Sequence, residues 1–303
     1  MIQFGDAESI AELKKLWKTC FFDEDAYINS FFHTFYESGN VLLTRENGML
    51  MGASFFLPGK LYRQNAMEQG SWQNIRYVYA LAVYPQFRGR GIAGDLLRTA
   101  FQMYYHTPLI AEPAEEGLID GFYEPLGFVP SFYLKKEQIR EQQISLRAAQ
   151  IQPYREQKEE FRQLDEMHIQ ICPVQTADYC RIRDLHFQKE GYISWPSRHI
   201  AFALQEHRSY GGEALLVSEN GREDLLLYMI EDGQVMITET TLPQDQALRS
   251  IDRWLKGSYD TVVYTSAASI SEKSETTKDS GLSLIGMSYG MPPVYGYLNL
   301  SLD

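Results

Sequence analysis

One junction of strand, glycine-rich turn and helix constrains this chain more than any other segment. The alternating apolar run Tyr77–Val83 predicts a strand ending at Pro85, and apolar spacing predicts a helix from about Ile92 to Tyr105. Between them lies Arg88-Gly89-Arg90-Gly91. Glycine lets backbone amides approach an anion closely, and the first turn of a helix leaves N–H donors unpaired at the positive end of its dipole. The junction therefore predicts an anion cradle, to which two arginines add charge-assisted donors.

The order of residues in this turn narrows the kind of anion. We expect it not to be a dinucleotide-binding turn, because the acidic ribose ligand of such turns has no clear counterpart, and not a P-loop, because no Lys-Ser or Lys-Thr pair follows the glycines. The run from Arg88 to Ala93 instead resembles the pyrophosphate loop [Gln/Arg]-x-x-Gly-x-[Gly/Ala] of the GNAT superfamily of N-acetyltransferases. It is preceded by Leu81-x-Val83-x-Pro85, which is similar to the strand end common in that superfamily. A solvated surface turn is the alternative reading.

A second match to the same superfamily follows at the expected distance. The segment Gly121-Phe-Tyr-Glu-Pro-Leu-Gly-Phe128 resembles its later F-Y-x-x-x-G-F signature, in which a helix carrying a tyrosine ends at glycine and a strand begins. Gly127 suits a left-handed helix C-cap, and Phe128 starts the predicted strand. The alternative for Tyr123 is an amphipathic core residue, but the two motifs in order favour a functional role.

The resemblance implies an α/β (α+β) fold with a mixed central sheet flanked by helices, and direct transfer of an acetyl group from acetyl-CoA to a primary amine in a ternary complex. It implies that Tyr123 protonates the leaving thiolate. A tyrosine of pKa near ~10 can do so with a small uphill penalty, since a thiol has a pKa near ~8.5. The residues implied to hold the coenzyme are Leu81, Ala82 and Val83 along the pantetheine, and Arg88, Gly89, Arg90, Gly91, Ile92, Ala93 and Gly94 around the pyrophosphate.

The general base is left open by the sequence. Many members of the superfamily place a glutamate on the central strand, whereas residues 75–83 contain no carboxylate. Glu112, just past the next predicted strand, is the nearest candidate, with a helix-start charge beside Pro113 as the equal alternative. In Eis-like relatives the terminal carboxylate serves as the base, a role that would fall here to Asp303. Water without a dedicated base is the remaining alternative.

The length of 303 residues predicts two domains. The first, residues 1–140, has the element order expected of a GNAT fold, including helices over Ala7–Cys20, Asp25–Tyr36 and Glu115–Leu126 and strands over Leu50–Leu57, Leu109–Ala111 and Phe128–Leu134. Residues 135–170 read as a polar connection with a solvated helix. The second domain, residues 141–303, repeats the coarse order, with its terminal strands inside Ser283–Asp303. Its equivalent of the phosphate loop, residues 241–246, contains no glycine and places Asp245 at the helix start, so we expect it not to bind coenzyme. This layout resembles Eis-like tandem acetyltransferases without their third domain.

The net charge and the composition limit the partners and the cellular location that we expect. A net charge of −12 disfavours nucleic acid and anionic membranes and suits an amine-bearing acceptor. Three scattered cysteines, no leader pattern and no apolar run of membrane-spanning length indicate the cytoplasm. The histidines lack metal-ligand spacing, so no metal is expected. A homo-oligomer is left open.

Two rival functions remain: a non-catalytic acyl-CoA-binding sensor, or an aminoacyl-tRNA-dependent transferase of the same fold, which the acidic balance disfavours. The acceptor, a small molecule or peptide, is not identified. Six aromatic residues either line its pocket or belong to the core, and these are Phe21, Phe22, Tyr27, Phe31, Phe32 and Phe35.

Overall fold

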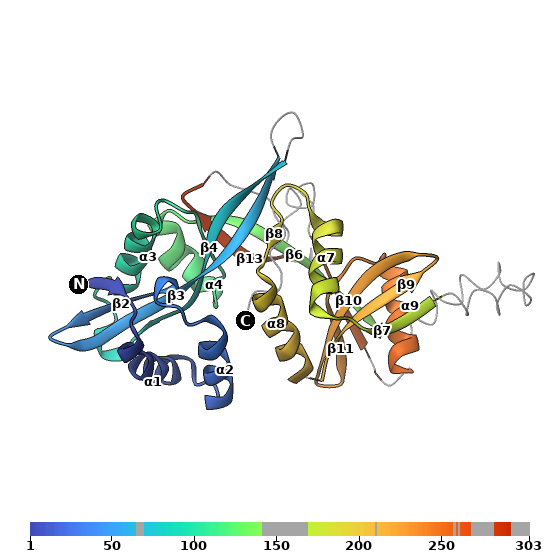
Figure 1. Cartoon of the computed structure of the whole chain (residues 1–303), viewed down its shortest axis with the longest axis horizontal. Coiled ribbons are helices and arrows are strands. Elements are labelled where there is room, and N and C mark those ends of the chain that lie inside the picture. The colour runs from blue at the N-terminus through green and yellow to red at the C-terminus, as the bar shows by residue number, and fades with distance from the viewer. Residues whose placement is uncertain are drawn as a thin grey trace, which may run out of the picture. The chain divides into compact units, whose positions relative to one another are not determined.

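The computed structural model describes residues 1–64, 70–140, 169–209, 211–256, 259, 261–267 and 282–291 (Figure 1). The chain divides into two compact units. The first comprises Met1–Phe132, Lys189–Arg198 and Leu284–Asp303, and the second comprises Tyr133–Gln188 and His199–Ser283. The sequence predicts a contiguous break after residue 140, whereas here two later segments belong with the first unit.

The strands of the first unit follow the order β1-β2-β3-β4-β5-β13, and the first residues of β6 also belong to this unit. β4 and β5 are parallel, and the pairs β1–β2, β2–β3, β3–β4 and β5–β13 are antiparallel. A short strand, β8 (Ile193–Ser194), pairs with β3. The strands are β1 (Ile2–Phe4), β2 (Val41–Glu46), β3 (Met49–Gln64), β4 (Gly70–Val83), β5 (Leu109–Ala111), β6 (Val129–Arg140) and β13 (Leu282–Tyr289).

Helices cover both faces of this sheet (Figure 1). One face carries α1 (Ile10–Phe21) and α2 (Asp25–Phe35), whose aromatic side chains pack on Phe55 and Tyr79. The other carries α3 (Ile92–Met103), which shares a buried cluster with Phe56 and Val78. Successive residues of a strand point to opposite faces, so neighbours such as Phe55 and Phe56 serve different layers.

The predicted helix over Glu115–Leu126 is a series of three short turns instead. These are α4 (Glu116–Leu118), the π-helical η4 (Ile119–Tyr123) and the 3₁₀ turn η5 (Glu124–Leu126). Gly117 and Gly121 favour helix weakly, and Pro125 lacks the N–H that a continuous helix needs. Gly127 follows with φ of 93°, which is the left-handed cap expected from the sequence.

Two strands are longer in the structure than the sequence predicts. The sequence predicts Leu50–Leu57 and Tyr77–Val83, whereas β3 and β4 continue as a long hairpin out to the pair Gln64↔Gly70. The extension is polar and contains Pro58 and Gly59, so it lacks the alternation that marks a strand. The sequence predicts a polar connection over residues 135–170. In the structure β6 extends into it as far as Arg140, and β7 begins near its end, at Ile169. The solvated helix predicted between them lies outside the described residues.

The second unit repeats the sheet pattern of the first, with the strand order β7-β9-β10-β11-β12-β6. As in the first unit, one central pair, β11–β12, is parallel, and its neighbours are antiparallel. Its elements are β7 (Ile169–Pro173), α7 (Thr176–Phe187), α8 (Ser197–Ser209), β9 (Glu213–Glu219), β10 (Arg222–Glu231), β11 (Gln234–Thr240), α9 (Gln244–Leu255) and β12 (Thr261–Ala267). None of the described helices is long and apolar enough to span a membrane.

Candidate functional site

The parallel strands β4 and β5 separate before β4 ends. Their last pair is Val78↔Ala111, while β4 stays paired with β3 as far as Gly52↔Val83. Ala80 has φ of 50° and lies at an irregularity in the β3–β4 register. Such a bulge re-aims a strand and ends its pairing on one side. Leu81, Ala82 and Val83 therefore lie on a strand end that β5 does not pair, as a peptide-like ligand arm requires.

The turn after β4 presents backbone amides at the start of α3. Gly89 and Gly91 have φ of 74° and 76°, a left-handed conformation that favours glycine. The first backbone bond of α3 runs from the Asp95 N–H to the Gly91 carbonyl at 3.0 Å, so the amides of residues 92–94 precede it. No side chain caps this end of α3. The turn and helix start thus have the features of a diphosphate cradle.

The two arginines of the turn are held by different partners. Arg88 Nε donates to the carbonyl of Val83 at 3.2 Å, which braces the end of β4. The Arg90 guanidinium contacts the carboxylate of Glu46, with its closest N–O distance 2.9 Å, and both side chains are about half exposed. Hydrogen bonding from Arg90 lowers the pKa of Glu46. A phosphate would have to compete with this exposed and weak pair for Arg90.

The turn that carries Tyr123 packs against the same helix. Tyr123 is buried in one cluster with Ile92 and Leu96 of α3. The packing is close at Gly94, where an added Cβ would lie 3.1 Å from Leu126 Cδ2. Tyr123, the acid predicted from the sequence, therefore packs in the same hydrophobic cluster as the start of α3, which carries the predicted cradle.

Glu112 follows β5 directly and is half-buried. The residue before it, Ala111, forms the last pair with β4, so Glu112 continues the chain from the point where the strands separate. Asp303, the other carboxylate considered for the base, lies outside the described residues.

The aromatic residues of the first two helices divide between core and surface. Phe31, Phe32 and Phe35 are buried and belong to the core. Phe31 and Phe32 contact Trp17, Phe32 also contacts Phe55, and Phe35 contacts Phe31. Phe22 is 83% exposed in a left-handed conformation at the end of α1, and Phe21 is also exposed. Tyr27 is half-buried, and its hydroxyl lies 2.7 Å from that of Tyr79.

Residues 2–130 match the family model of the acetyltransferase (GNAT) domain. The first domain is a GNAT acetyltransferase domain. Membership of this family supports acyl transfer as the class of reaction. A search of curated proteins finds no match.

Solved structures share the fold over nearly the whole chain. A GCN5-related N-acetyltransferase from Anabaena variabilis ATCC 29413 is 13% identical, with a TM-score of 0.67 over 95% of this chain and 72% of that one. A probable N-acyltransferase from Enterococcus faecalis V583 is 12% identical, with a TM-score of 0.66 over 95% and 72%. Eis1 from Mycobacterium abscessus is 10% identical, with a TM-score of 0.63 over 100% and 74%. The shared fold over nearly the whole chain fits an Eis-like tandem arrangement.

Gly89, Gly91 and Gly94 also have the spacing G-x-G-x-x-G of a dinucleotide-binding turn. That fingerprint belongs to a βαβ unit of a parallel sheet, in which the glycines join two parallel strands through a helix. In this domain β4, α3 and β5 also form a strand–helix–strand unit with parallel strands, although β4 pairs on its other side with the antiparallel β3. The glycine spacing therefore does not separate the two motifs, and the match of residues 2–130 to the GNAT domain model decides between them.

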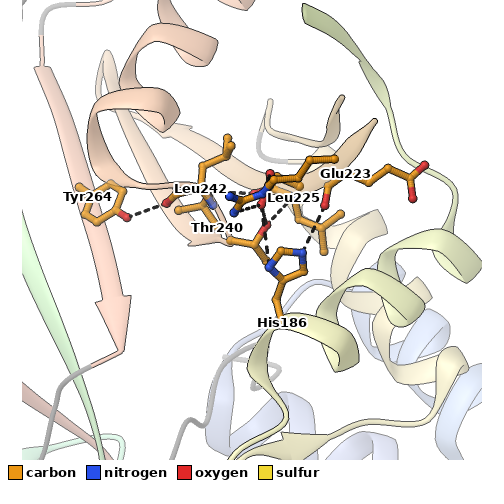
Figure 2. Close-up of polar contacts among 9 residues, drawn as sticks. His186, Glu223, Leu225, Thr240, Leu242 and Tyr264 are labelled. Atoms are coloured by element: carbon orange, nitrogen blue, oxygen red, sulfur yellow. Dashed lines mark hydrogen bonds and ion pairs between the residues drawn. The ribbon is translucent and has the colours of Figure 1, made fainter. Parts of the chain in front are cut away.

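The corresponding junction of the GNAT-like second domain is closed by hydrogen bonds, shown in Figure 2. The Thr241 N–H donates to the Leu225 carbonyl at 3.1 Å, and the Leu242 N–H donates to Thr240 Oγ1 at 3.1 Å. Thr241 Oγ1 donates to the buried carboxylate of Asp224 at 2.8 Å. The backbone amides of Thr241 and Leu242 are thus already used, and the carboxylate of Asp224 lies next to Thr241.

The central strand of the GNAT-like domain also carries a buried ion pair. β11 pairs with β12 only as far as Ile237↔Tyr264, so Glu239 lies beyond the last pair. Arg183 Nε donates to both Glu239 oxygens at 3.0 and 3.1 Å, and the Tyr179 hydroxyl donates to one of them at 2.5 Å. The side chains of Arg183 and Glu239 are 1% and 0% exposed. The sequence analysis did not single out these residues, because α7 and β11 bring them together from 56 positions apart.

One contribution to the GNAT domain comes from the far end of the sequence. Met287 of β13 is buried in the cluster that holds Tyr123, and Ser288 Oγ lies 2.7 Å from Ser131 Oγ. Local sequence patterns carry no signal for such a long-range pairing. Among the described residues, no group of three His, Cys, Asp or Glu side chains has a metal-binding arrangement.

Proposed function

We propose that this chain transfers the acetyl group of acetyl-CoA to a primary amine of a small molecule or peptide, by direct attack in a ternary complex. The observation that carries the proposal is the splayed end of β4 leading into a helix start with free N–H donors, packed in one layer with Tyr123. Acetyl-CoA supplies the activated acyl group as a thioester. The residues of the chain bind the coenzyme and transfer the protons.

Each group has a distinct task. The amides of Gly89, Gly91, Ile92 and Ala93 donate to the diphosphate, with Arg88 and Arg90 as charge partners. The backbone of Leu81–Val83 pairs with the pantetheine arm. Tyr123 gives its proton to the leaving sulfur, and Glu112, which follows β5 where the strands separate, is the carboxylate assigned to take one from the amine.

The second domain has a different role in this proposal. Its junction contains no glycine, the carboxylate of Asp224 on β10 accepts a hydrogen bond from Thr241 in it, and Asp245 lies in the first turn of α9. Two carboxylates near a helix start repel a diphosphate and satisfy the helix dipole themselves. We therefore expect one coenzyme site per chain, which a calorimetric titration with acetyl-CoA measures directly. Two equivalent sites would contradict this assignment.

The test of the reaction is an amine panel with acetyl-CoA, read by the release of free thiol. The Tyr123→Phe variant should lower turnover by about 100-fold while leaving the affinity for acetyl-CoA nearly intact, because one acid is lost and the cradle is unchanged. Tyr104→Phe is the matched control, since Tyr104 is buried in the same cluster and donates to the Gly39 carbonyl at 2.8 Å. Coenzyme binding with no acetylated amine would instead favour the acyl-CoA-binding sensor.

A further inference from the structure

Two tyrosine hydroxyls meet beside the splayed end of β4. Tyr27 of α2 and Tyr79 of β4 have hydroxyl oxygens 2.7 Å apart, although the residues are 52 positions apart in sequence. Tyr79 is 8% exposed, and Tyr27 is half-buried. The pair therefore joins a buried hydroxyl on the central strand to one nearer the solvent.

Tyr79 occupies a defined place on the strand. It is the first residue of β4 beyond the last β4–β5 pair, Val78↔Ala111, and it directly precedes the left-handed Ala80. Ser54 Oγ donates to the Tyr79 carbonyl at 3.2 Å, which fixes this backbone to β3. Its ring is stacked on Phe31 at a centroid distance of 5.1 Å and an angle of 26°. Side chain and backbone are both held where the strands separate.

The two faces of β4 carry different chemistry. Val78 packs with α3 and with Tyr123, whereas Tyr79 packs with α1 and α2. In the proposed function, Tyr123 protonates the leaving sulfur on the α3 face. Because α3 and the turn of Tyr123 occupy that face, the acceptor amine is placed in this inference on the other face of the strand, that of Tyr79.

We propose that Tyr79 and Tyr27 form a relay that takes the proton from the acceptor amine. This inference rests on the proposed acetyl transfer, and in it the tyrosine pair takes the place of Glu112 as the acceptor of the amine's proton. No carboxylate lies on β4 between Ile75 and Val83, and Tyr79 is the tyrosine of this face that directly precedes the bulge at Ala80, with its hydroxyl against that of Tyr27 from α2. The pair needs no tyrosinate, because each hydroxyl accepts one proton and passes on its own.

The step balances in atoms and charge. The amine nitrogen forms a bond to the acetyl carbon, and the carbon–sulfur bond breaks. The nitrogen's proton passes to the Tyr79 oxygen, the Tyr79 proton passes to the Tyr27 oxygen, and the Tyr27 proton passes to water. The sulfur takes the proton of Tyr123, which is restored from solvent. No oxidant, reductant or metal is required.

The test compares three tyrosine-to-phenylalanine variants. Tyr79→Phe and Tyr27→Phe should each lower kcat for amine acetylation by about 10-fold or more near neutral pH, with unchanged affinity for coenzyme A. The deficit should shrink above about pH 9, where hydroxide takes the proton directly. Tyr77→Phe is the matched control, because Tyr77 is buried on the same strand two residues away. Its kcat should equal that of the wild type.

The outcomes separate this inference from the proposed function. A wild-type chain that acetylates no amine overturns both. An active wild type whose Tyr79→Phe and Tyr27→Phe variants keep full kcat at every pH overturns the relay alone, as does an equal loss in Tyr77→Phe or a deficit that is independent of pH. If Tyr79→Phe does not fold, by circular dichroism, Tyr27→Phe decides, because its half-buried hydroxyl can be removed with little effect on the core.

Discussion

Tyr289 is stacked on Phe128, with ring centroids 5.2 Å apart and an interplanar angle of 28°. Phe128 in turn contacts the Tyr123 ring edge-on at 5.2 Å, and its N–H donates to the Tyr123 carbonyl at 3.1 Å. Tyr289 also contacts Phe101 of α3 at 5.0 Å. A residue of the last described strand therefore supports both the turn of the proposed acid and the helix of the proposed cradle.

Removing the Tyr289 ring should impair turnover more than coenzyme affinity. Tyr289→Ala leaves a void beside Phe128, which should cost about 2 kcal/mol of unfolding free energy because the ring is only partly buried. The turn of Tyr123 then loses its support, whereas the amides of residues 89–94 lie at the other end of α3. Steady-state kinetics should show kcat falling and KM for acetyl-CoA nearly unchanged.

Tyr289→Phe separates the ring from the hydroxyl. It keeps the stacking on Phe128 and should restore wild-type kcat. Equal losses in the Ala and Phe variants, or a loss confined to KM, would show that Tyr289 does not act by packing against the turn of Tyr123.

Gly91 should be intolerant of any side chain, although there is room for one. An added Cβ meets nothing within 4 Å, but a φ of 76° costs an L-residue about 1–2 kcal/mol. Gly91→Ala should relieve that strain by moving the amides of the turn. Loss of one charge-assisted hydrogen bond is worth about 1.5–3 kcal/mol, so calorimetry should show acetyl-CoA affinity falling by about 10- to 100-fold.

The matched control for Gly91 is Gly221→Ala. Gly221 lies in the β9–β10 turn with φ of 80° and equally open surroundings. It carries the same backbone strain away from the proposed cradle, so its unfolding free energy should fall while coenzyme affinity stays constant. A Gly91→Ala variant that binds acetyl-CoA normally would remove the turn from the proposed site.

The sequence was sufficient for the local parts of the fold. Alternation, glycine placement and two short motifs predict the β4–α3 junction and the left-handed Gly127, because each depends on neighbours within a few residues. The helix expected over Glu115–Leu126 is present as consecutive helical turns, but their change to π and 3₁₀ geometry was not predicted. The placement of β13 and the meeting of Tyr27 with Tyr79 could not be predicted, since each depends on pairing between distant segments that leaves no local pattern.

Breaking the Arg183–Glu239 pair should destabilise the second domain strongly. Glu239→Gln leaves a buried guanidinium without its counter-ion, which costs about 3–5 kcal/mol. The double variant Arg183→Met with Glu239→Met removes both charges at similar volume and should recover most of that loss. Urea denaturation measures the unfolding free energies of the wild type, of Glu239→Gln and of the double variant.

Arg249 and Asp245 provide the exposed comparison for this pair. They form an i,i+4 ion pair at 3.0 Å with both side chains about half exposed. Arg249→Met should change the unfolding free energy by less than about 1 kcal/mol. If the buried double variant is as unstable as Glu239→Gln, the pair contributes through its specific hydrogen bonds rather than by mutual neutralisation.

His207 should make the second domain less stable in mild acid. Its ring lies between the Ala203 carbonyl at 2.9 Å and Thr238 Oγ1 at 3.1 Å, and burial lowers its pKa below the ordinary value of 6.5. Above that value the ring is neutral in both the folded and the unfolded chain. As the pH falls below 6.5, His207 binds a proton in the unfolded chain but not in the folded one, so the unfolding free energy falls. This loss continues until the pH passes the lowered pKa of the folded chain. Urea titrations of the wild type and His207→Gln at pH 8, 6.5 and 5.5 should therefore show two curves that converge as the pH falls, because glutamine keeps hydrogen-bonding groups but does not titrate. Curves that stay parallel over this range would show that His207 accepts its proton equally well in both states.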